Sequence, residues 1–149
     1  MGTERNQARL DANKARVRVM FEEIVSRGRL DLTDEVFAPD FTWPQFGLSG
    51  PDGVRAWVSR LRAAFPDVQD TVELQVAEGD VVVTLVTLRG TQTGQWGPLP
   101  PSRCRAEFPA IGIDRFDGDR VIERFALFDM ADAMRQLGHL PDQAGDDRA

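Results

Sequence analysis

The sequence predicts an α+β fold in which helices cover one face of a curved antiparallel sheet. The first 65 residues place apolar side chains at helical spacing, whereas after Pro66 the spacing changes to the alternation typical of strands. The turn sequences Gly79-Asp80 and "DGDR" (117–120) separate the strand-like runs and predict hairpins. Helices followed by consecutive hairpins are typical of α+β domains and not of parallel α/β sheets.

The length and composition indicate one globular domain. The 149 residues are 42% hydrophobic and 28% charged, and we expect a single domain spanning 1–149 with an ordered core over about 12–140 and frayed ends. The net charge of -6 disfavours nucleic acid and anionic lipid as partners. No apolar run approaches the roughly 20 residues that span a membrane. The polar N-terminus does not resemble a secretory signal.

The single cysteine and single histidine limit redox and metal chemistry. Cys104 has no partner for an intrachain disulfide, which fits a cytoplasmic location. With His139 as the only imidazole, a zinc site would need mostly carboxylates. We therefore expect no metal and no cofactor.

Three helical segments are expected before the strands. The first carries one buried face and ends at Gly28. A short helical turn begins at Thr33, an N-cap residue, and stops before Pro39. After the extended aromatic segment "DFTWPQFG" (40–47), "SGPDG" opens a third helix that continues to Phe65. The apolar stripes are Val17, Met20, Phe21, Ile24 and Val25 in the first helix, and Val54, Trp57, Val58, Leu61 and Phe65 in the third.

Four strand-like runs and a last helix complete the chain. "DTVELQVAEG" (70–79) alternates Val72, Leu74 and Val76 with polar residues, and "VVVTLVTLRGTQTG" (81–94) is rich in β-branched residues. We expect residues 81–90 to pair with 103–115, and 108–116 with 121–128. "DMADAMRQLG" (129–138) predicts a helix with Asp129 as its N-cap.

Several strings resemble the SnoaL-like polyketide cyclases of the NTF2-like superfamily. They are "LRGTQTG" with the proline loop "GPLPPS", then "IDRFDGDRVIERF" and "FDMADAMRQLG", within about residues 12–140. The resemblance implies a cone-shaped NTF2-like barrel whose sheet wraps around the N-terminal helices and encloses a deep apolar pocket. It also implies a small apolar or polyketide-like substrate and a homodimer joined through the outer face of the sheet.

The aromatic residues are candidates for lining this pocket, although buried aromatic side chains usually belong to the core. Trp43 and Phe46 lie in an extended segment, and Trp96 lies in a loop, where side chains often close a binding site. The candidate substrate-binding residues are Trp43, Phe46, Trp57, Phe65, Gln92, Trp96, Gly112, Ala126 and Phe128. Gln92 is open to two interpretations, a donor to a substrate carbonyl or a residue that holds the turn.

The acid/base residues that the resemblance implies are missing. The family string resembling "EHWD" falls on residues 123–126, so that Ala126 occupies the carboxylate position, and the family histidine would fall near Gly112. Three charged candidates remain, each with an alternative role. Asp114 is either an acid that faces the pocket or an outward residue that pairs with Arg115 or Arg124. Arg124 is either an inward cation or a surface residue. Asp129 is either a catalytic acid or only the N-cap of the last helix.

Strand alternation supports an inward orientation for the first two candidates. Asp114 shares a face with Ala110 and Gly112, and Arg124 shares a face with Ala126. Small residues on both faces leave room for a pocket floor, so we expect both sets to face the cavity.

Three functions fit these features. The first is a cyclase for a polyketide or similar natural product that works mainly by holding the substrate in a reactive shape, as in a cycloaddition. The second is an acid/base enzyme of epoxide hydrolase or isomerase type that uses Asp114 and Arg124. The third is a noncatalytic binder of small apolar molecules.

The segment Thr91–Ser102 is expected to lie over the pocket mouth. Gly94 and Gly97 flank Trp96, and the prolines at 98, 100 and 101 stiffen the second half of the segment. Either the segment is a mobile lip whose Trp96 contacts the ligand, or Trp96 permanently caps the end of the barrel or the dimer seam.

Overall fold

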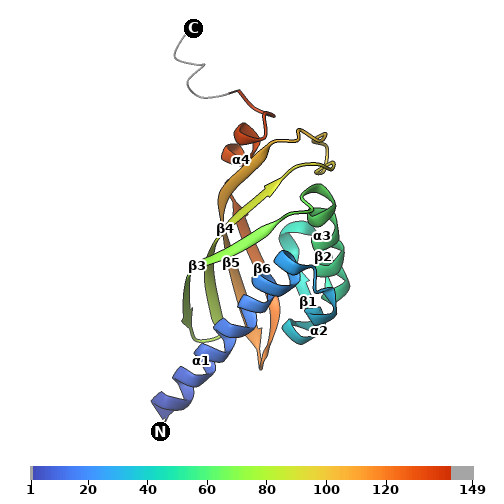
Figure 1. Cartoon of the computed structure of the whole chain (residues 1–149). Coiled ribbons are helices and arrows are strands. Elements are labelled where there is room, and N and C mark those ends of the chain that lie inside the picture. Colours follow the sequence, from blue (N-terminus) through green and yellow to red (C-terminus); the bar gives the residue numbers. More distant parts are fainter. Residues whose placement is uncertain (1, 142–149) are drawn as a thin grey trace.

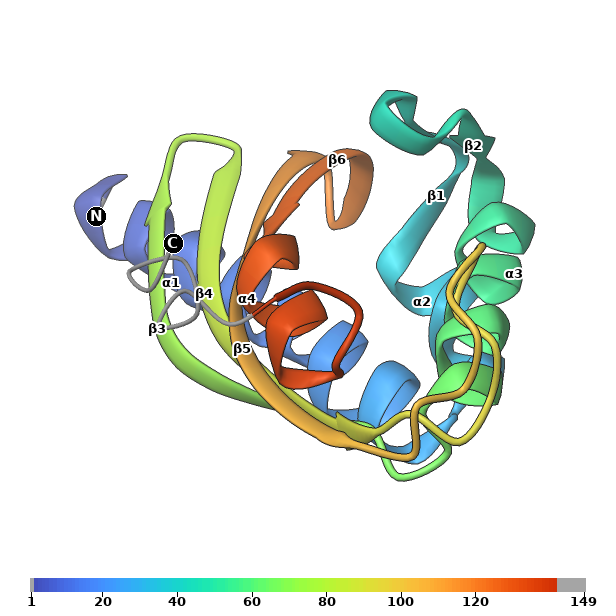
Figure 2. The same ribbon diagram turned by 90° about the horizontal axis from the view of Figure 1, so that it is seen from above.

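The computed structural model describes residues 2–141 and shows helices held inside a strongly curved sheet (Figures 1 and 2). This agrees with the predicted α+β class. The elements in chain order are α1 (Gly2–Val19), the π-helical η1 (Met20–Val25), η2 (Leu30–Leu32), α2 (Thr33–Val36), β1 (Phe37–Trp43), η3 (Pro44–Phe46), β2 (Leu48–Ser49), α3 (Gly50–Ala64), β3 (Gln69–Glu78), β4 (Val81–Thr91), β5 (Arg105–Asp117), β6 (Arg120–Phe128) and α4 (Met130–Gln136).

The sheet has the order β2-β1-β6-β5-β4-β3, and both predicted hairpins are present. Strand β4 pairs antiparallel with β5 from Val81↔Arg115 to Thr91↔Arg105, and β5 pairs antiparallel with β6. The expectation of a purely antiparallel sheet is wrong, because β1 runs parallel to β6. Strand β1 comes after the first helices and returns along the free edge of the last strand, which leaves that edge less open to pairing with other chains. Alternating side chains show that a segment is a strand but not whether it pairs parallel or antiparallel, so the sequence did not reveal the parallel pairing of β1 with β6.

A β-bulge in β3 changes the side-chain alternation that the sequence predicts. The register with β4 shifts between Val72 and Leu74. Val72 is half-buried, whereas Leu74 and Val76 are 57% and 56% exposed. The expectation that the three apolar residues share one face is therefore wrong, because the extra residue reverses the alternation.

The C-terminal part of α1, η1 and α3 cover the concave side of the sheet, whereas α4 lies at one end of it (Figures 1 and 2). Met20, Ile24 and Val25 of η1 and Val54 and Val58 of α3 are almost fully buried, as the helical spacing predicts. None of the helices within residues 2–141 combines the length and hydropathy needed to cross a bilayer.

The ends of two helices differ from the prediction. The first helix begins at Gly2, so residues 2–10 are helical and not frayed; the frayed tail expected at 142–149 lies outside the described residues. Thr33 is the first residue of α2 and not its cap. Its hydroxyl donates to the Leu30 carbonyl at 2.8 Å, which joins η2 to α2.

The outer face of the sheet exposes apolar side chains among residues 2–141, which leads to a prediction about assembly. Ile111, Ile113, Phe125 and Leu127 are between 38% and 56% exposed on neighbouring strands. A contiguous apolar surface is typical of a protein interface. We expect a homodimer through this face, and we expect Phe125→Glu to give monomers in sedimentation at micromolar concentration. Wild-type protein that sediments as a monomer would contradict the expectation.

Candidate active site

An apolar groove opens between α3, α4, β6 and the loop after β4. Its volume is about 550 Å³, within the size range of small-molecule sites. Four aromatic side chains line it: Phe46, Trp57, Trp96 and Phe128. Trp57 lies with its ring centroid 6.1 Å from Phe128 and 6.5 Å from Phe46, in stacked arrangements. The groove therefore offers flat apolar surfaces to a ligand.

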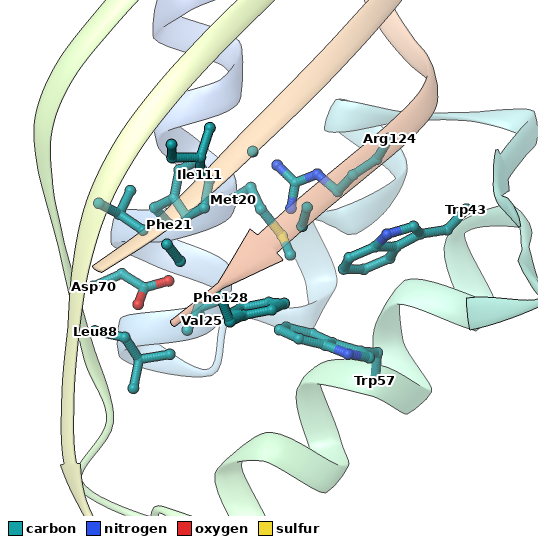
Figure 3. Close-up of a pocket in the computed structure, with 14 residues that line it drawn as sticks. Met20, Phe21, Val25, Trp43, Trp57, Asp70, Leu88, Ile111, Arg124 and Phe128 are labelled. Carbon is teal, nitrogen blue, oxygen red and sulfur yellow. The ribbon is translucent and has the colours of Figure 1, made fainter. Parts of the chain in front are cut away.

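The groove continues into a narrow inner chamber with polar groups (Figure 3). Trp57, Leu88, Ala126 and Phe128 line both spaces, so the two meet there. The chamber has a volume of about 20 Å³, which accommodates about one water-sized group. Charged side chains among its lining residues are Asp70 of β3 and Arg124 of β6, which reach into it from opposite walls (Figure 3).

Arg124 is held by a buried ion pair with Asp114. The two residues are direct partners across β5 and β6. Arg124 donates from Nε to Oδ1 at 2.7 Å and from Nη2 to Oδ2 at 2.9 Å, and the side chains are 3% and 0% exposed. Rings of Phe21, Phe37 and Trp43 lie 5.1–5.6 Å from the guanidinium carbon. This paired geometry fixes the cation and, within residues 2–141, leaves Nη1 without a hydrogen-bond acceptor.

The small residues beside the pair make room for it, as the sequence predicts. Asp114, Gly112 and Ala110 pair with Arg124, Ala126 and Phe128 across the two strands, with their side chains toward the helices. A Cβ on Gly112 would lie 3.4 Å from the Phe21 ring and 3.8 Å from Nη2 of Arg124. The prediction that both strand faces point inward is therefore confirmed.

Asp70 is a site residue that the sequence analysis missed. It is 9% exposed, and its Oδ1 is enclosed without a hydrogen-bond partner among residues 2–141. Burial raises the pKa of Asp70 to about 7, and the charge of Arg124 offsets part of this rise. One signal was available, because Asp70 is in phase with Val72 on the apolar face of the predicted strand.

The backbone around Asp70 is tied to the first helix. The amide of Asp70 donates to Ser26 Oγ at 2.9 Å, and that hydroxyl donates to the Phe21 carbonyl at 2.7 Å. Phe21 belongs to the π-helical η1, a type of irregularity that often marks functional sites. These bonds hold the start of β3 against the chamber.

Four predicted site residues line neither the groove nor the chamber: Asp114, which lies behind Arg124, and Asp129, Phe65 and Gln92. Asp129 is exposed and accepts a hydrogen bond from the Asp132 amide at 3.2 Å, so it is the predicted N-cap and does not line the groove or the chamber. Phe65 is fully buried behind Trp96, with ring centroids 5.0 Å apart. Gln92 is fully buried, and its Nε2 lies within hydrogen-bond distance of three loop carbonyls, those of Gly94, Leu99 and Pro100. Gln92 therefore holds the loop and lines neither the groove nor the chamber.

The loop that carries Trp96 is anchored at its base. The amides of Thr93 and Gly94 both donate to the Ala64 carbonyl at 3.1 Å. A Cβ on Gly94 would lie 2.1 Å from the Ala63 carbonyl oxygen, so this glycine allows close approach to α3. Trp96 packs on Phe65 and also lines the groove, so it contributes to both core and site.

Trp96→Ala is expected to affect binding and stability together. Loss of the ring should weaken binding of an apolar fluorescent dye such as anilinonaphthalene sulfonate by about 1–3 kcal/mol, the range for an anchoring aromatic. Loss of the contact with Phe65 should also lower Tm by several degrees. Trp96→Phe is the matched control and should retain most of both. Unchanged dye affinity in Trp96→Ala would exclude Trp96 from the binding surface.

Comparisons with known proteins agree with this geometry. Residues 15–137 match the family model of the SnoaL-like polyketide cyclases. TsrD from Streptomyces laurentii has a similar structure, with a TM-score of 0.78 and 24% identity over 89% of this chain and 97% of its own.

Two further solved structures share the fold. A protein from Jannaschia sp. CCS1, named "putative SnoaL-like polyketide cyclase", has a TM-score of 0.79 and 26% identity over 88% of this chain and 94% of its own. AclR from Streptomyces galilaeus, named "a putative hydroxylase", has a TM-score of 0.78 and 24% identity over 93% of this chain and 90% of its own. No curated protein matches the sequence. With a family model that covers most of its length and the NTF2-like α+β fold, the chain belongs to the SnoaL-like polyketide cyclase family.

Proposed function

We propose that the protein is an enzyme that closes a ring in a polyketide or related natural-product intermediate. The observation that carries this proposal is the apolar groove that narrows to a chamber containing a fixed cation, Arg124. Membership of the family supports ring closure as the reaction class, and the name of the Jannaschia protein agrees with it.

The groove and the chamber suit different parts of such a substrate. The stacked rings of Phe46, Trp57 and Phe128 match an unsaturated, apolar chain. The chamber admits about one oxygen-sized group, and Nη1 of Arg124 is the donor available to a carbonyl oxygen there. Holding both ends of the reacting segment in one geometry lowers the barrier by several kcal/mol.

The arrangement supports closure by orientation more strongly than acid/base chemistry by Asp114. In a cycloaddition, π-electron pairs become the new σ bonds, and no proton moves. A hydrogen bond from Arg124 to a carbonyl conjugated with one reacting double bond would withdraw electrons from it and stabilise charge that develops on the oxygen. Both oxygens of Asp114 accept hydrogen bonds from Arg124, so Asp114 positions the cation and is not free to reach a substrate.

The experiment is an assay with linear, unsaturated polyketide-type chains that end in a ketone, with the products analysed by mass spectrometry. We expect a cyclic product; one with the substrate's mass indicates cycloaddition, whereas loss of water indicates a condensation. Trp57→Leu should slow closure about tenfold or more because the stacking surface is lost. Phe125→Leu, on the outer face, is the matched aromatic control and should not. Saturable binding without any cyclic product would instead establish a noncatalytic binder.

A further inference from the structure

We propose that Asp70 is a catalytic acid/base residue of this chamber, which moves a proton at a carbon next to the carbonyl whose oxygen Arg124 binds. The proposal rests on the proposed function for the location of the substrate. Ala126 occupies the position where the resemblance implies a carboxylate. Asp70 would supply a carboxylate from the opposite wall of the chamber instead.

The surroundings of Asp70 favour a role toward a ligand over a structural role. A buried carboxyl without a hydrogen-bond partner destabilises a fold, and buried polar groups are nearly always paired. Asp114 shows the paired arrangement in the same structure, with both oxygens bound to Arg124. Asp70 instead lines an open space that has room for one small group, and it faces the cation across that space (Figure 3).

The charged groups near Asp70 come from two sides. In the chamber, Arg124 of β6 is the facing charge, with Asp114 of β5 behind it. On the other side, Glu22, Glu23 and Arg27 line a surface hollow together with Asp70. Burial dominates over these charges and raises the pKa of Asp70 to about 7. A group with such a pKa exchanges protons readily near neutral pH.

The step is balanced without any cofactor. The Asp70 carboxylate takes a proton from the carbon next to the substrate carbonyl. The C–H electron pair forms the C=C bond of an enolate, and the carbonyl π pair moves to the oxygen, where Arg124 stabilises the negative charge. The protonated Asp70 then returns its proton to the same carbon, or to an oxygen formed when the enolate carbon attacks a second carbonyl.

The test uses 2-tetralone, an apolar bicyclic ketone, and monitors deuterium exchange next to its carbonyl in D₂O by NMR. Wild-type protein should accelerate exchange over buffer, with a rate that rises with pH through about 7 and is level above it, because the ionised carboxylate is the base. Asp70→Asn should reduce the protein-catalysed rate by about 10²–10⁴-fold. Glu78→Gln, at the other end of the same strand, is the matched control and should retain it.

The outcomes separate this proposal from the proposed function. Exchange catalysed by wild type and lost in Asp70→Asn supports the role of Asp70 even if no polyketide chain is cyclised. Exchange in Asp70→Asn at the wild-type rate, or ring closure by condensation, with loss of water, that persists in Asp70→Asn, overturns it. Absence of catalysed exchange by wild type across the pH range also overturns it.

Discussion

Arg124→Met should destabilise the protein by about 3–5 kcal/mol, the largest loss that we expect from one substitution. The guanidinium makes both hydrogen bonds of the fully buried Asp114 carboxylate, so its removal leaves an uncompensated charge in the core. Urea denaturation at neutral pH measures the change.

The double variant Asp114→Leu/Arg124→Met shows whether the loss of stability comes from the unpaired buried charge or from altered packing. Apolar replacement of a buried ion pair is often neutral or stabilising, so the double variant should recover most of the lost stability. It should remain inactive in ring closure, because the donor in the chamber is absent. A single Arg124→Met variant as stable as wild type would show that Asp114 does not depend on this partner.

Asp70→Asn should raise the free energy of unfolding by about 2–4 kcal/mol at pH 8. The folded pKa of about 7 lies well above the ordinary aspartate value near 4, so the folded protein holds this proton more tightly than the unfolded chain does. Stability therefore falls as pH rises from about 4 to about 7 and is level above that range. The asparagine variant lacks this ionisation, and its advantage should disappear near pH 4.

Urea denaturation of wild type and Asp70→Asn at pH 4 and pH 8 checks this dependence. The exposed Glu78→Gln should show no comparable difference between the two pH values. An Asp70→Asn variant that is less stable than wild type at pH 8 would show that the carboxylate is satisfied in the fold. If replacing Asp70 makes the fold more stable, the carboxylate is retained at a cost in stability, as expected of a group that serves activity.

The sequence predicted the features that depend on local pattern. Both hairpins, the inward orientation of Asp114 and Arg124, and the capping role of Asp129 result from alternation, turn residues and cap chemistry. The buried ion pair was not predicted: pairing of Asp114 with Arg124 was considered only for an outward Asp114, because alternation gives a face and not a partner. The exclusion of Asp114 from proton transfer needed the geometry of both hydrogen bonds.

Features set by tertiary contacts were not predictable. The parallel pairing of β1 with β6 joins residues about eighty positions apart, and the bulge in β3 reverses an otherwise clear alternation. Phe65 and Gln92 have types that suit a binding site, yet packing assigns one to the core behind Trp96 and the other to the loop carbonyls. Asp70 was missed because its position across the chamber from Arg124 depends on the fold of the whole chain.

The most direct test of the substrate site is a crystal structure of the protein with bound 2-tetralone. The proposed function predicts that the ligand's rings lie in the groove against the exposed surfaces of Trp57 and Phe128, with the ketone oxygen at hydrogen-bond distance from Nη1 of Arg124. The adjacent carbon should then face Asp70. A ketone that points out of the groove toward solvent, or a ligand bound only outside the groove and chamber, would contradict the account.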